Sequence, residues 1–405
     1  MDLKPYIHTL VSGCGVLSEA DAFACASLVA ANEFDPLQLS SLVTALAMRG
    51  ETADVIAGFA RAFRNVANKV EIGGVVTEIV GTGGDGLATQ NISTAASILA
   101  AACGARVAKH GSVSVSSLSG SADVLASLGV ARLRSAPLIE ACVESAGIAF
   151  LFAPFFHPAL RAAAPVRAAL KMRTVFNLLG PLLNPAGAQH VLLGVWSRAL
   201  LPVMAAALKS LGVRRALVVH TPLPAQVGGG GTASASPSPS PSASASASAS
   251  ASASAPSSSV GLDELATIGP CFAIELMEDG RLQELIIDAQ EWGVPLAQIK
   301  DLEGGTPGEN AAGLRVLFAG GTQAADSHLG RTVALNAGAA LYVSGKADTI
   351  REGYGMALCA LREGKGLVTL DKWIKVSELL LEEESANLIK IIEETRQRDV
   401  YGKGT

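Results

Sequence analysis

The 405-residue chain is poor in aromatic side chains, paired cysteines and long apolar segments, and each shortage excludes a class of protein. Aromatic residues are only 4% of the sequence although 49% is hydrophobic, so its cores must be built from small aliphatic side chains. The six cysteines form no C-x-x-C pair, which argues against a zinc ribbon or a dithiol redox motif and favours reduced core thiols. No apolar run is long enough to span a bilayer, so we expect a soluble protein without a membrane partner.

An excess of positive charge is also missing. The formal net charge is −5, which argues against a broad nucleic-acid-binding face, so we expect no nucleic-acid partner. The first residues, Met1-Asp2-Leu3-Lys4-Pro5-Tyr6, have the pattern of neither a signal peptide nor a transit peptide. Outside one low-complexity tract, the chain is long enough for two domains with substantial cores.

The most informative segment is the glycine-rich turn Gly81-Thr82-Gly83-Gly84-Asp85-Gly86. A predicted strand precedes it at residues 77–80, and Ser93-Thr94 is predicted to cap a buried helix over residues 95–103 that Gly104 ends. A strand, a glycine turn and a helix start bring backbone N–H groups to one spot, which favours phosphate binding. The alternative is a turn that serves close packing only. The spacing matches neither the dinucleotide fingerprint nor a Walker loop, which ends in Lys-Ser/Thr.

A second candidate phosphate loop follows the next predicted strand. Residues 107–111 predict a strand that carries Lys109, and residues 112–121 form a loop crowded with serines. A helix is predicted over residues 122–128 and is stopped by Gly129. Serine-rich loops are often plain connectors, but a preceding lysine and a following helix start favour an oxyanion site.

The punctuation of the chain predicts an α/β fold. Residues 1–69 predict short helices, with Ser18 and Asp21 as a capping box, Pro36 and Gly50 at the ends of one helix, and Thr52 capping the next. Beyond Glu78, apolar strands at residues 148–152, 191–195 and 216–220 alternate with helices at 136–145 and 198–211. This alternation is typical of a mixed, mostly parallel sheet covered by helices.

Several longer motifs occur in order along the chain and carry a family resemblance. They are Gly81-Thr82-Gly83-Gly84-Asp85-Gly86, Asn91-Ile92-Ser93-Thr94, Lys109-His110-Gly111, Ser119-Gly120-Ser121-Ala122-Asp123-Val124-Leu125, His157-Pro158-Ala159, Pro165-Val166-Arg167, Arg173-Thr174-Val175-Phe176-Asn177-Leu178-Leu179-Gly180-Pro181-Leu182-Leu183-Asn184-Pro185 and Gly261-Leu262-Asp263-Glu264. Together they resemble the anthranilate phosphoribosyltransferases of tryptophan biosynthesis, as far as about Ser377. The segment Thr369-Leu370-Asp371-Lys372-Trp373-Ile374 is most similar to the plant and algal branch.

This resemblance implies an enzyme that transfers the phosphoribosyl group of 5-phosphoribosyl 1-pyrophosphate to the amine of anthranilate and releases pyrophosphate. An aryl amine is neutral at pH 7 and needs no strong base. The protein must therefore supply alignment of the two substrates and charge stabilisation of the departing diphosphate.

The resemblance also implies site residues. The matching substrate-binding positions are Gly81, Gly84, Asp85, Thr89, Asn91, Ile92, Ser93, Thr94, Lys109, His110, Gly111, Ser112, Ser117, Ser121 and Arg167. Ser93, Asp263 and Glu264 match Mg²⁺ ligands, and hard oxygen donors favour Mg²⁺ over zinc or copper. The residues implied to carry catalysis are Lys109, Arg167, Asp263 and Glu264.

Each assignment has a plainer alternative. An Asp-Glu pair is ordinarily a solvated surface feature, and only its place in the Gly-Leu-Asp-Glu motif favours metal binding. Arg167 suits the carboxylate of anthranilate because a guanidinium pairs with it bidentately, but on a predicted helix over residues 158–171 it could equally face solvent. Gly81 and His110 would lie near the aromatic ring, whereas His157 could merely cap that helix.

The chain departs from the family pattern directly after Lys109-His110-Gly111. Family members usually carry Asn-Arg there, and this chain has Ser112 and Val113. A serine offers one short hydroxyl in place of an amide. The departure leaves the expected donor site unchanged and concerns affinity for the acceptor.

The resemblance implies a domain organisation. Residues 1–69, joined by about 164–185, would form a helical domain, and residues 70–163 and 186–378 an α/β domain of nucleoside phosphorylase and phosphoribosyltransferase type. Residues 228–259, with Ser-Pro and Ser-Ala alternation, predict a disordered insertion, and residues 379–405 a C-terminal helix or tail. A homodimer through the helical domain is implied, and the branch resemblance implies the plastid stroma, otherwise the cytoplasm.

Two other functions remain open at this point. A pyrimidine nucleoside phosphorylase of the same broad fold would carry a different lysine loop and a Ser-Gly-Arg motif, which the sequence lacks. A non-catalytic nucleic-acid-binding relative would have a basic face and would have lost its carboxylates, whereas Asp263 and Glu264 are present in an acidic chain.

Overall fold

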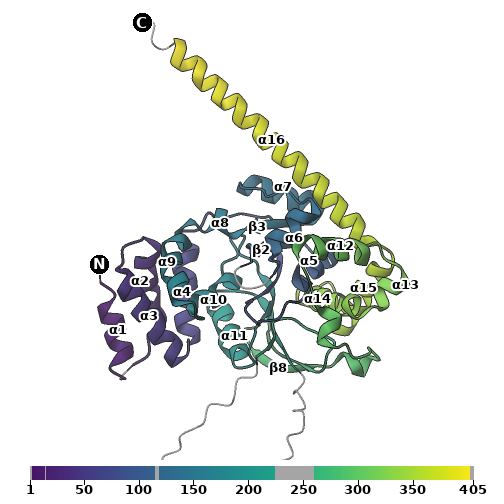
Figure 1. Ribbon diagram of the computed structural model, residues 1–405, viewed down its shortest axis with the longest axis horizontal. Coiled ribbons are helices and arrows are strands. Elements are labelled where there is room, and N and C mark those ends of the chain that lie inside the picture. Colours follow the sequence, from purple (N-terminus) through teal and green to yellow (C-terminus); the bar gives the residue numbers. More distant parts are fainter. Residues whose placement is uncertain (1, 14, 115–117, 224–259, 402–405) are drawn as a thin grey trace, which may run out of the picture.

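The computed structural model describes residues 2–13, 15–114, 118–223 and 260–401. A small lobe of helices and a larger lobe with a central sheet lie side by side, and one long C-terminal helix extends from the larger lobe (Figure 1). The predicted insertion at residues 228–259 lies outside the described residues.

The small lobe begins with α1 (Lys4–Val11), α2 (Glu19–Ala30), α3 (Pro36–Arg49) and α4 (Ala53–Asn65). The predicted caps are confirmed. The Ser18 hydroxyl accepts the backbone N–H of Asp21 at 3.1 Å, and the Thr52 hydroxyl accepts that of Val55 at 3.3 Å. Local capping chemistry therefore sets where these helices begin.

A later passage of the chain packs on this lobe. The short helices α9 (Ala164–Leu170) and α10 (Val175–Leu179) contact α3 and α4. Phe176 meets Phe59 and Phe63 edge to face, with ring centroids 6.2 and 6.0 Å apart. The buried Arg64 guanidinium donates from Nε to the Leu182 carbonyl at 2.6 Å. Residues from two distant parts of the sequence thus share one core.

The larger lobe is built on a mixed sheet in the order β3-β2-β1-β4-β5-β7-β8, with β6 paired to β5. Its parallel strands are β1 (Thr77–Gly81), β2 (Val107–Gly111), β3 (Ile148–Phe152), β4 (His190–Gly194) and β5 (Arg215–Pro222). The antiparallel strands are β6 (Gly261–Leu262), β7 (Cys271–Leu276) and β8 (Leu282–Ile287). The mostly parallel sheet is as predicted. The antiparallel edge was not foreseen.

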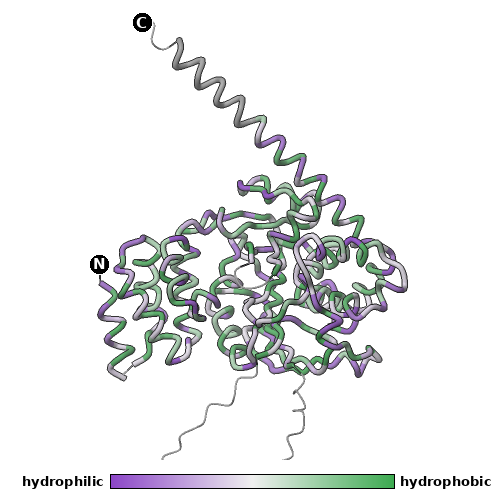
Figure 2. Tube along the Cα trace, in the orientation of Figure 1, coloured by the Kyte–Doolittle hydropathy of each residue, from purple (hydrophilic) through white to green (hydrophobic). Residues whose placement is uncertain are grey.

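Helices cover the sheet and bury its aliphatic strands. They are α5 (Ile92–Ala102), α6 (Ser121–Leu128), α7 (Ala136–Ala146), α8 (Ala153–Phe156), α11 (Leu200–Ser210), α12 (Pro307–Phe318), α13 (Gly321–Asp326), α14 (His328–Val343) and α15 (Ile350–Arg362). Small side chains let α14 lie buried against α5 and α15. Hydrophobic residues, drawn in green, are frequent along these helices and strands (Figure 2).

The C-terminal helix α16 (Lys365–Tyr401) is continuous across the predicted boundary at residue 378. Its first turns pack on α5 and α7, where Trp373 is buried. Within the described residues, no helix is long and apolar enough to cross a membrane.

Two local predictions are wrong. Helix α5 starts at Ile92 with Asn91 at its N-cap position, so Ser93 and Thr94 lie in its first turn and do not cap it. The predicted helix over residues 158–171 is a 3₁₀ turn at Pro158–Ala163 followed by α9. Pro165 has no backbone N–H to extend a helix from the preceding turn, which accounts for the break.

Candidate active site

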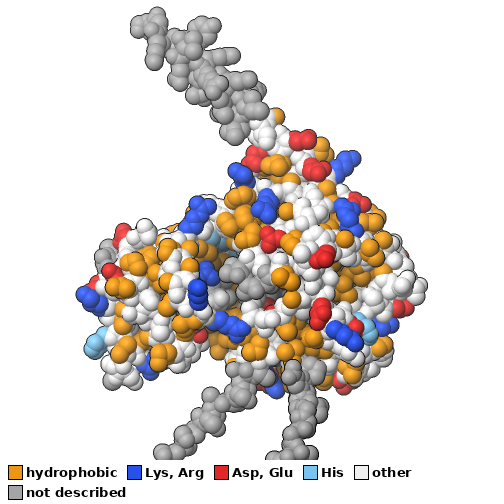
Figure 3. All heavy atoms as spheres, viewed as in Figure 1, with side chains coloured by type: hydrophobic (Ala, Val, Ile, Leu, Met, Phe, Trp, Pro, Cys, Tyr) orange, Lys and Arg blue, Asp and Glu red, His pale blue; other side chains and the backbone are white. Residues whose placement is uncertain are grey.

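A cavity of about 410 Å³ opens where the glycine and serine loops leave the sheet and the small lobe faces them. Gly81 ends β1 and Gly111 ends the neighbouring parallel strand β2, so both loops start at the carboxyl ends of the parallel strands. Lys and Arg side chains gather along the boundary between the two lobes (Figure 3). Ligands of open parallel sheets bind at this edge.

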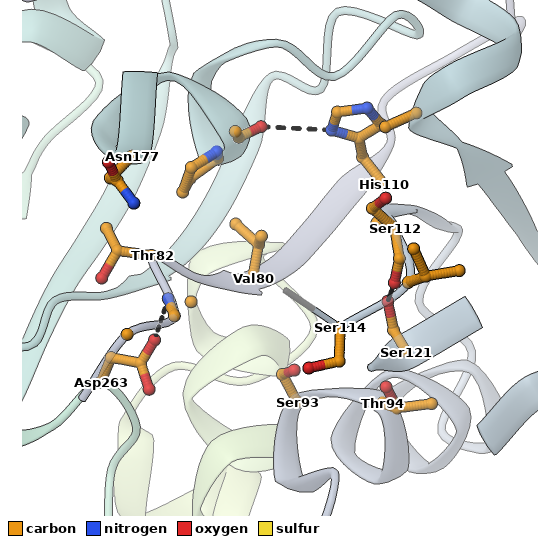
Figure 4. A pocket seen from close by; sticks show the side chains of 18 of the residues that line it. Val80, Thr82, Ser93, Thr94, His110, Ser112, Ser114, Ser121, Asn177 and Asp263 are labelled. Atoms are coloured by element: carbon orange, nitrogen blue, oxygen red, sulfur yellow. Dashed lines mark hydrogen bonds between the residues drawn. The ribbon is translucent and has the colours of Figure 1, made fainter. Parts of the chain in front are cut away.

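Most of the predicted site residues line this cavity. They are Gly81, Gly84, Asn91, Ser93, Thr94, Lys109, His110, Gly111, Ser112, Ser121, Arg167, Asp263 and Glu264. Ser93, Thr94 and Asp263 lie on one side of the cavity and His110 on the other (Figure 4). The fold thus brings together segments more than a hundred residues apart in sequence. These segments form two facing walls of the cavity.

Three predicted residues do not line the cavity. The Ile92 side chain belongs to the hydrophobic core, and its backbone N–H donates to the Gln90 carbonyl at 2.7 Å. Thr89 pairs with Glu303 in an antiparallel bridge at the outer end of the glycine loop. Asp85 lies behind the lining and interacts with Asp263, and burial raises its pKa. A fourth predicted residue, Ser117, falls outside the described residues.

Lys109 reaches the cavity floor from β2. It is 2% exposed, and its Nζ donates to the Ile79 carbonyl at 3.0 Å and to the Ser93 hydroxyl at 3.3 Å. Burial lowers the pKa of Lys109 to about 8, while Glu264 and Glu78 oppose the shift. Among the described residues nothing takes the third Nζ–H, and an incoming anion would favour the charged form of the lysine.

The adjacent carboxylates Asp263 and Glu264 accept backbone amides of the glycine loop and of the first turn of α5. The Asp263 Oδ2 accepts the Gly83 N–H at 2.5 Å, and the Glu264 Oε1 accepts the Ser93 N–H at 3.0 Å. Burial, and then repulsion by Asp85, raise the pKa of Asp263 to about 7. Burial, and then repulsion by Asp263, raise the pKa of Glu264 to about 8. The two carboxyls therefore repel each other in a buried setting, and the surface-pair alternative is wrong.

Two glycines admit this carboxylate segment to the sheet edge. A methyl group at Gly194, the last residue of β4, would lie 1.5 Å from the Asp263 carbonyl oxygen. One at Gly81 would lie 2.4 Å from the Asp263 Oδ2. Since no Cβ tolerates such distances, residues 261–264 reach their place only because both strands end in glycine.

The donor set around these carboxylates fits Mg²⁺. Crowded, buried carboxyls with raised pKa values beside the Ser93 hydroxyl supply hard oxygen ligands. Among the described residues, no three His, Cys, Asp or Glu side chains converge on one metal ion.

Buried hydroxyls on the same side lack partners. Thr94 is fully buried in the first turn of α5, yet its Oγ1 has no hydrogen-bond partner within the described ranges, and the same holds for the Thr82 Oγ1. Both residues line the cavity. Because an unpaired buried hydroxyl is unfavourable, both await a polar ligand.

The opposite wall is built around Arg167 of α9. Its guanidinium lies over the Phe176 ring, 5.5 Å from the centroid, and burial lowers its pKa. No carboxylate of the described residues pairs with it within ion-pair distance. A cavity-lining, half-desolvated guanidinium beside an aromatic ring suits a ligand that carries both a carboxylate and a ring.

His110, which lines the cavity, forms a neutral pair with His157, which does not. Their rings meet edge to face at 5.2 Å, and His157 occupies the N-cap position of the 3₁₀ turn at Pro158–Ala163, where its side chain makes no capping hydrogen bond to the described residues. Burial and the neighbouring His157 lower the pKa of His110 to about 3, and burial lowers that of His157 to about 4. The His110 Nδ1 lies 3.2 Å from the Gly180 carbonyl, which can only accept, so Nδ1 carries the proton.

Ser112 and Val113, the departures from the family pattern, both line the cavity. Asp123 of α6 holds the serine loop by accepting the N–H groups of Ser114 and Gly120, each at 3.0 Å. The departure therefore lies on a cavity wall whose backbone is anchored.

The sequence interpretation assigned no substrate contact to several lining residues, namely Val80, Thr82, Gly83, Val113, Ala153, Phe176, Asn177, Gly180 and Pro181. Phe176 and Asn177 lie in a motif that carried the resemblance but received no role, and Gly180-Pro181 of the same motif was interpreted only as a hinge. The motif that contains these residues was the signal in the sequence that could have identified them as part of the cavity. Only the fold shows that this helical passage faces the glycine loop.

Known protein families match nearly the whole chain. The helical bundle domain of the glycosyl transferase family matches residues 4–67, and its a/b domain matches residues 73–225 and 240–367. An anthranilate phosphoribosyltransferase from Shewanella sp. (strain W3-18-1) is 40% identical over 381 residues, covering 93% of this chain and 97% of the relative.

Solved structures agree with this match. Anthranilate phosphoribosyltransferase from Thermus thermophilus is 36% identical with a TM-score of 0.76, over 93% of this chain and all of that one. The Saccharomyces cerevisiae enzyme, solved in complex with PRPP and Mg, shares the fold at a TM-score of 0.76 and 24% identity, over 93% and 98% of the chains. This chain belongs to the anthranilate phosphoribosyltransferases, within the glycosyl transferase family that joins a helical bundle to an a/b domain.

Proposed function

We propose that this protein transfers the phosphoribosyl group of 5-phosphoribosyl 1-pyrophosphate to the amine of anthranilate in tryptophan biosynthesis. The anthranilate nitrogen bonds to the anomeric carbon, the bond from that carbon to the diphosphate oxygen breaks, and the amine loses one proton. The observation that carries the proposal is one cavity lined by both phosphate loops, the Asp263-Glu264 pair and Arg167.

The donor is proposed to bind the wall formed by the glycine and serine loops. The Thr94 hydroxyl and the Nζ–H of Lys109 that has no partner in the described part of the chain are positioned for phosphate oxygens. Preorganised donors stabilise the charge that develops on a leaving diphosphate, and Lys109 contributes a full charge in a dry setting.

Magnesium is the proposed cofactor, with Ser93, Asp263 and Glu264 as the residues that would hold it. When bound, the ion neutralises charge on the diphosphate. Its double charge would also relieve the repulsion that raises the pKa values of Asp263 and Glu264.

Anthranilate is proposed to bind the opposite wall, with its carboxylate on Arg167. No strong base is needed because the attacking aryl amine is already neutral. The lowered pKa of His110 agrees with this: the imidazole is uncharged at pH 7, and its unprotonated nitrogen can only accept a hydrogen bond.

Residues 1–69 and 164–185 are proposed to act as one domain that closes over the substrates. Support comes from the shared Phe59, Phe63 and Phe176 core, and from cavity residues contributed by both lobes. Closure would exclude water and align the two substrates.

We further infer a homodimer through the helical domain. Val11, Val16, Leu37 and Met48 of this lobe are exposed apolar side chains. Analytical ultracentrifugation should find a dimer, and Leu37→Glu with Met48→Glu should produce a monomer. A monomeric wild-type protein would contradict the inference.

The plant and algal branch, and with it the plastid stroma, is proposed from residues 369–374. Trp373 of this segment is buried where α16 leaves the larger lobe. Locating the native protein in cells of its source would test the compartment.

The direct test follows the loss of anthranilate fluorescence on addition of phosphoribosyl pyrophosphate and Mg²⁺. Lys109→Ala should slow the decay at least about a hundredfold, since it removes a preorganised donor to the leaving group. Asp263→Asn with Glu264→Gln should abolish it. The proposal fails if folded wild-type protein leaves the fluorescence unchanged.

A further inference from the structure

One buried amide outside the cavity joins α12 to the start of α5, directly after the glycine loop, and through Asn91 to the serine loop. Asn310 lies in α12, is 1% exposed and is not among the residues that line the cavity. Its Oδ1 accepts the backbone N–H of Gly305 at 2.7 Å, and its Nδ2 donates to the Asn91 Oδ1 at 2.9 Å. A buried side chain with both ends of its amide engaged is locked in orientation.

Asn91 passes this connection to the serine loop. Its Nδ2 donates to the Ser119 carbonyl at 2.9 Å, and its Oδ1 also accepts the Ser119 hydroxyl at 3.1 Å. Asn91 itself lines the cavity at the start of α5. The glycine loop, the serine loop and α12 therefore meet in one chain of hydrogen bonds.

The direction of donors and acceptors along this series of hydrogen bonds is fixed at both ends. A side-chain amide can usually be turned so that its oxygen and nitrogen exchange places. Here the Gly305 N–H can only donate and the Ser119 carbonyl can only accept. One orientation of each amide satisfies both ends, so the Asn91 oxygen must face Asn310.

This orientation decides what Asn91 presents to a ligand. Two donors, from Asn310 and Ser119, occupy both lone pairs of its Oδ1. Among the described residues, its Nδ2 makes one hydrogen bond and has a second hydrogen left. Asn91 therefore offers the cavity a donor and no acceptor, which suits phosphate or sugar oxygens.

The backbone next to Asn310 is tied to the glycine loop as well. The Gln90 N–H donates to the Leu302 carbonyl at 2.9 Å, and the Gly304 N–H to the Ala88 carbonyl at 2.7 Å. A methyl group at Gly304 would lie 2.6 Å from the Thr89 carbonyl oxygen. The segment that leads into α12 thus holds Asn310 at a set distance from Asn91.

We propose that Asn310 is a positioning residue for the phosphoribosyl pyrophosphate site, which orients the Asn91 amide and couples the two phosphate loops without touching the substrate. The inference rests on the proposed function, because it assigns a purpose to the donor wall of that site. The amide of Asn310 acts through polarity, so a change of polarity should matter more than a loss of volume.

The test compares Asn310→Asp and Asn310→Ala with the control Leu314→Ala, a fully buried residue one turn further along α12. The aspartate still accepts the Gly305 N–H but turns an oxygen toward the Asn91 oxygen. We expect the KM for phosphoribosyl pyrophosphate to rise at least about tenfold in Asn310→Asp and less in Asn310→Ala, with the KM for anthranilate within about twofold. Leu314→Ala should lower the melting temperature and leave both KM values alone.

Different results would overturn the positioning role of Asn310 and the proposed function of the protein. If folded Asn310→Asp keeps the wild-type KM for the donor, the positioning role is wrong; Asn310→Ala provides the same decision if the aspartate variant does not fold. A rise that Leu314→Ala reproduces in proportion to its lost stability also overturns it. If wild-type protein neither consumes anthranilate nor binds phosphoribosyl pyrophosphate in calorimetry, the proposed function itself fails.

Discussion

The cavity has two walls that differ in how their polar groups are held. The donor wall is the one proposed to bind phosphoribosyl pyrophosphate, and the acceptor wall is the one proposed to bind anthranilate. The donor wall is crowded with polar groups that bond to one another: amides of the glycine loop and α5 face carboxylates, and Asn91 is held from two sides. The acceptor wall has few polar groups, and Arg167 faces the cavity beside an aromatic ring. The donor wall is therefore sensitive to displacement, and the acceptor wall to the loss of a single group.

The largest expected effect is on the donor wall. Gly194→Ala would place a methyl group 1.5 Å from the Asp263 carbonyl and push the carboxylate segment outward. Because a shift of about 1 Å is enough to lose about a hundredfold in rate, turnover should fall by at least that factor. The measurement is anthranilate fluorescence decay at saturating Mg²⁺. Gly308→Ala, where a methyl group meets open space, is the control and should keep full activity.

The next effect concerns the acceptor wall. Arg167→Ala removes the guanidinium proposed to pair with the anthranilate carboxylate, which should raise the KM for anthranilate about 10- to 100-fold. The KM for phosphoribosyl pyrophosphate should change little, since Arg167 lies on the opposite wall from the phosphate loops. Arg167→Lys keeps the charge without the fork and should fall between. An equal change in both KM values would erase the distinction between the walls.

The lowered pKa values of His110 and His157 predict that the free energy of unfolding depends on pH. The folded-state pKa of His157 is lowered to about 4, so below its ordinary value of 6.5 the unfolded chain binds the extra proton. Its contribution to stability is full above pH 6.5 and is lost as pH falls toward 4, at about 1.4 kcal/mol per pH unit. His157→Gln should therefore lose less stability than wild type between pH 6.5 and 5.

Urea unfolding at those two pH values measures the difference. The buried carboxyls Glu78, Asp263 and Glu264, whose pKa values are raised, act in the opposite direction. They are present in both proteins and cancel in the comparison. His8→Gln, on the surface of α1, is the control. The prediction is contradicted if His157→Gln loses as much stability between the two pH values as His8→Gln does.

The smallest effect tests the departure from the family pattern. Ser112→Asn restores the amide of the family pattern at a position that lines the cavity, and it should lower the KM for anthranilate about fivefold through one added hydrogen bond. The KM for the phosphoribosyl donor should stay the same. A donor KM that moves instead would place Ser112 functionally on the donor wall.

Local chemistry explains what the sequence predicts well. The caps at Ser18 and Thr52, the turn at residues 81–86 and the parallel strands depend on neighbours along the chain, and each is found where expected. The N-cap of α5 was misplaced because Asn, Ser and Thr all suit that position and three of them occur between Asn91 and Thr94.

Other features depend on distant contacts and were not predicted. Asn310 is an ordinary helix residue until the fold brings it to Asn91, 219 positions away. Phe176 and Asn177 enter the cavity because α10 packs on the small lobe. Strands β7 and β8 form an antiparallel edge that the alternation of strands and helices does not announce.

The bare ends of β1 and β4 have a consequence for anyone who wishes to redesign this protein. Backbone spacing, set by two residues without side chains, dictates where the carboxylate segment rests. If the proposed metal role holds, exchanging the groups at 263 and 264 would alter the preference for one ion over another. Their location cannot be altered without rebuilding the sheet beneath them.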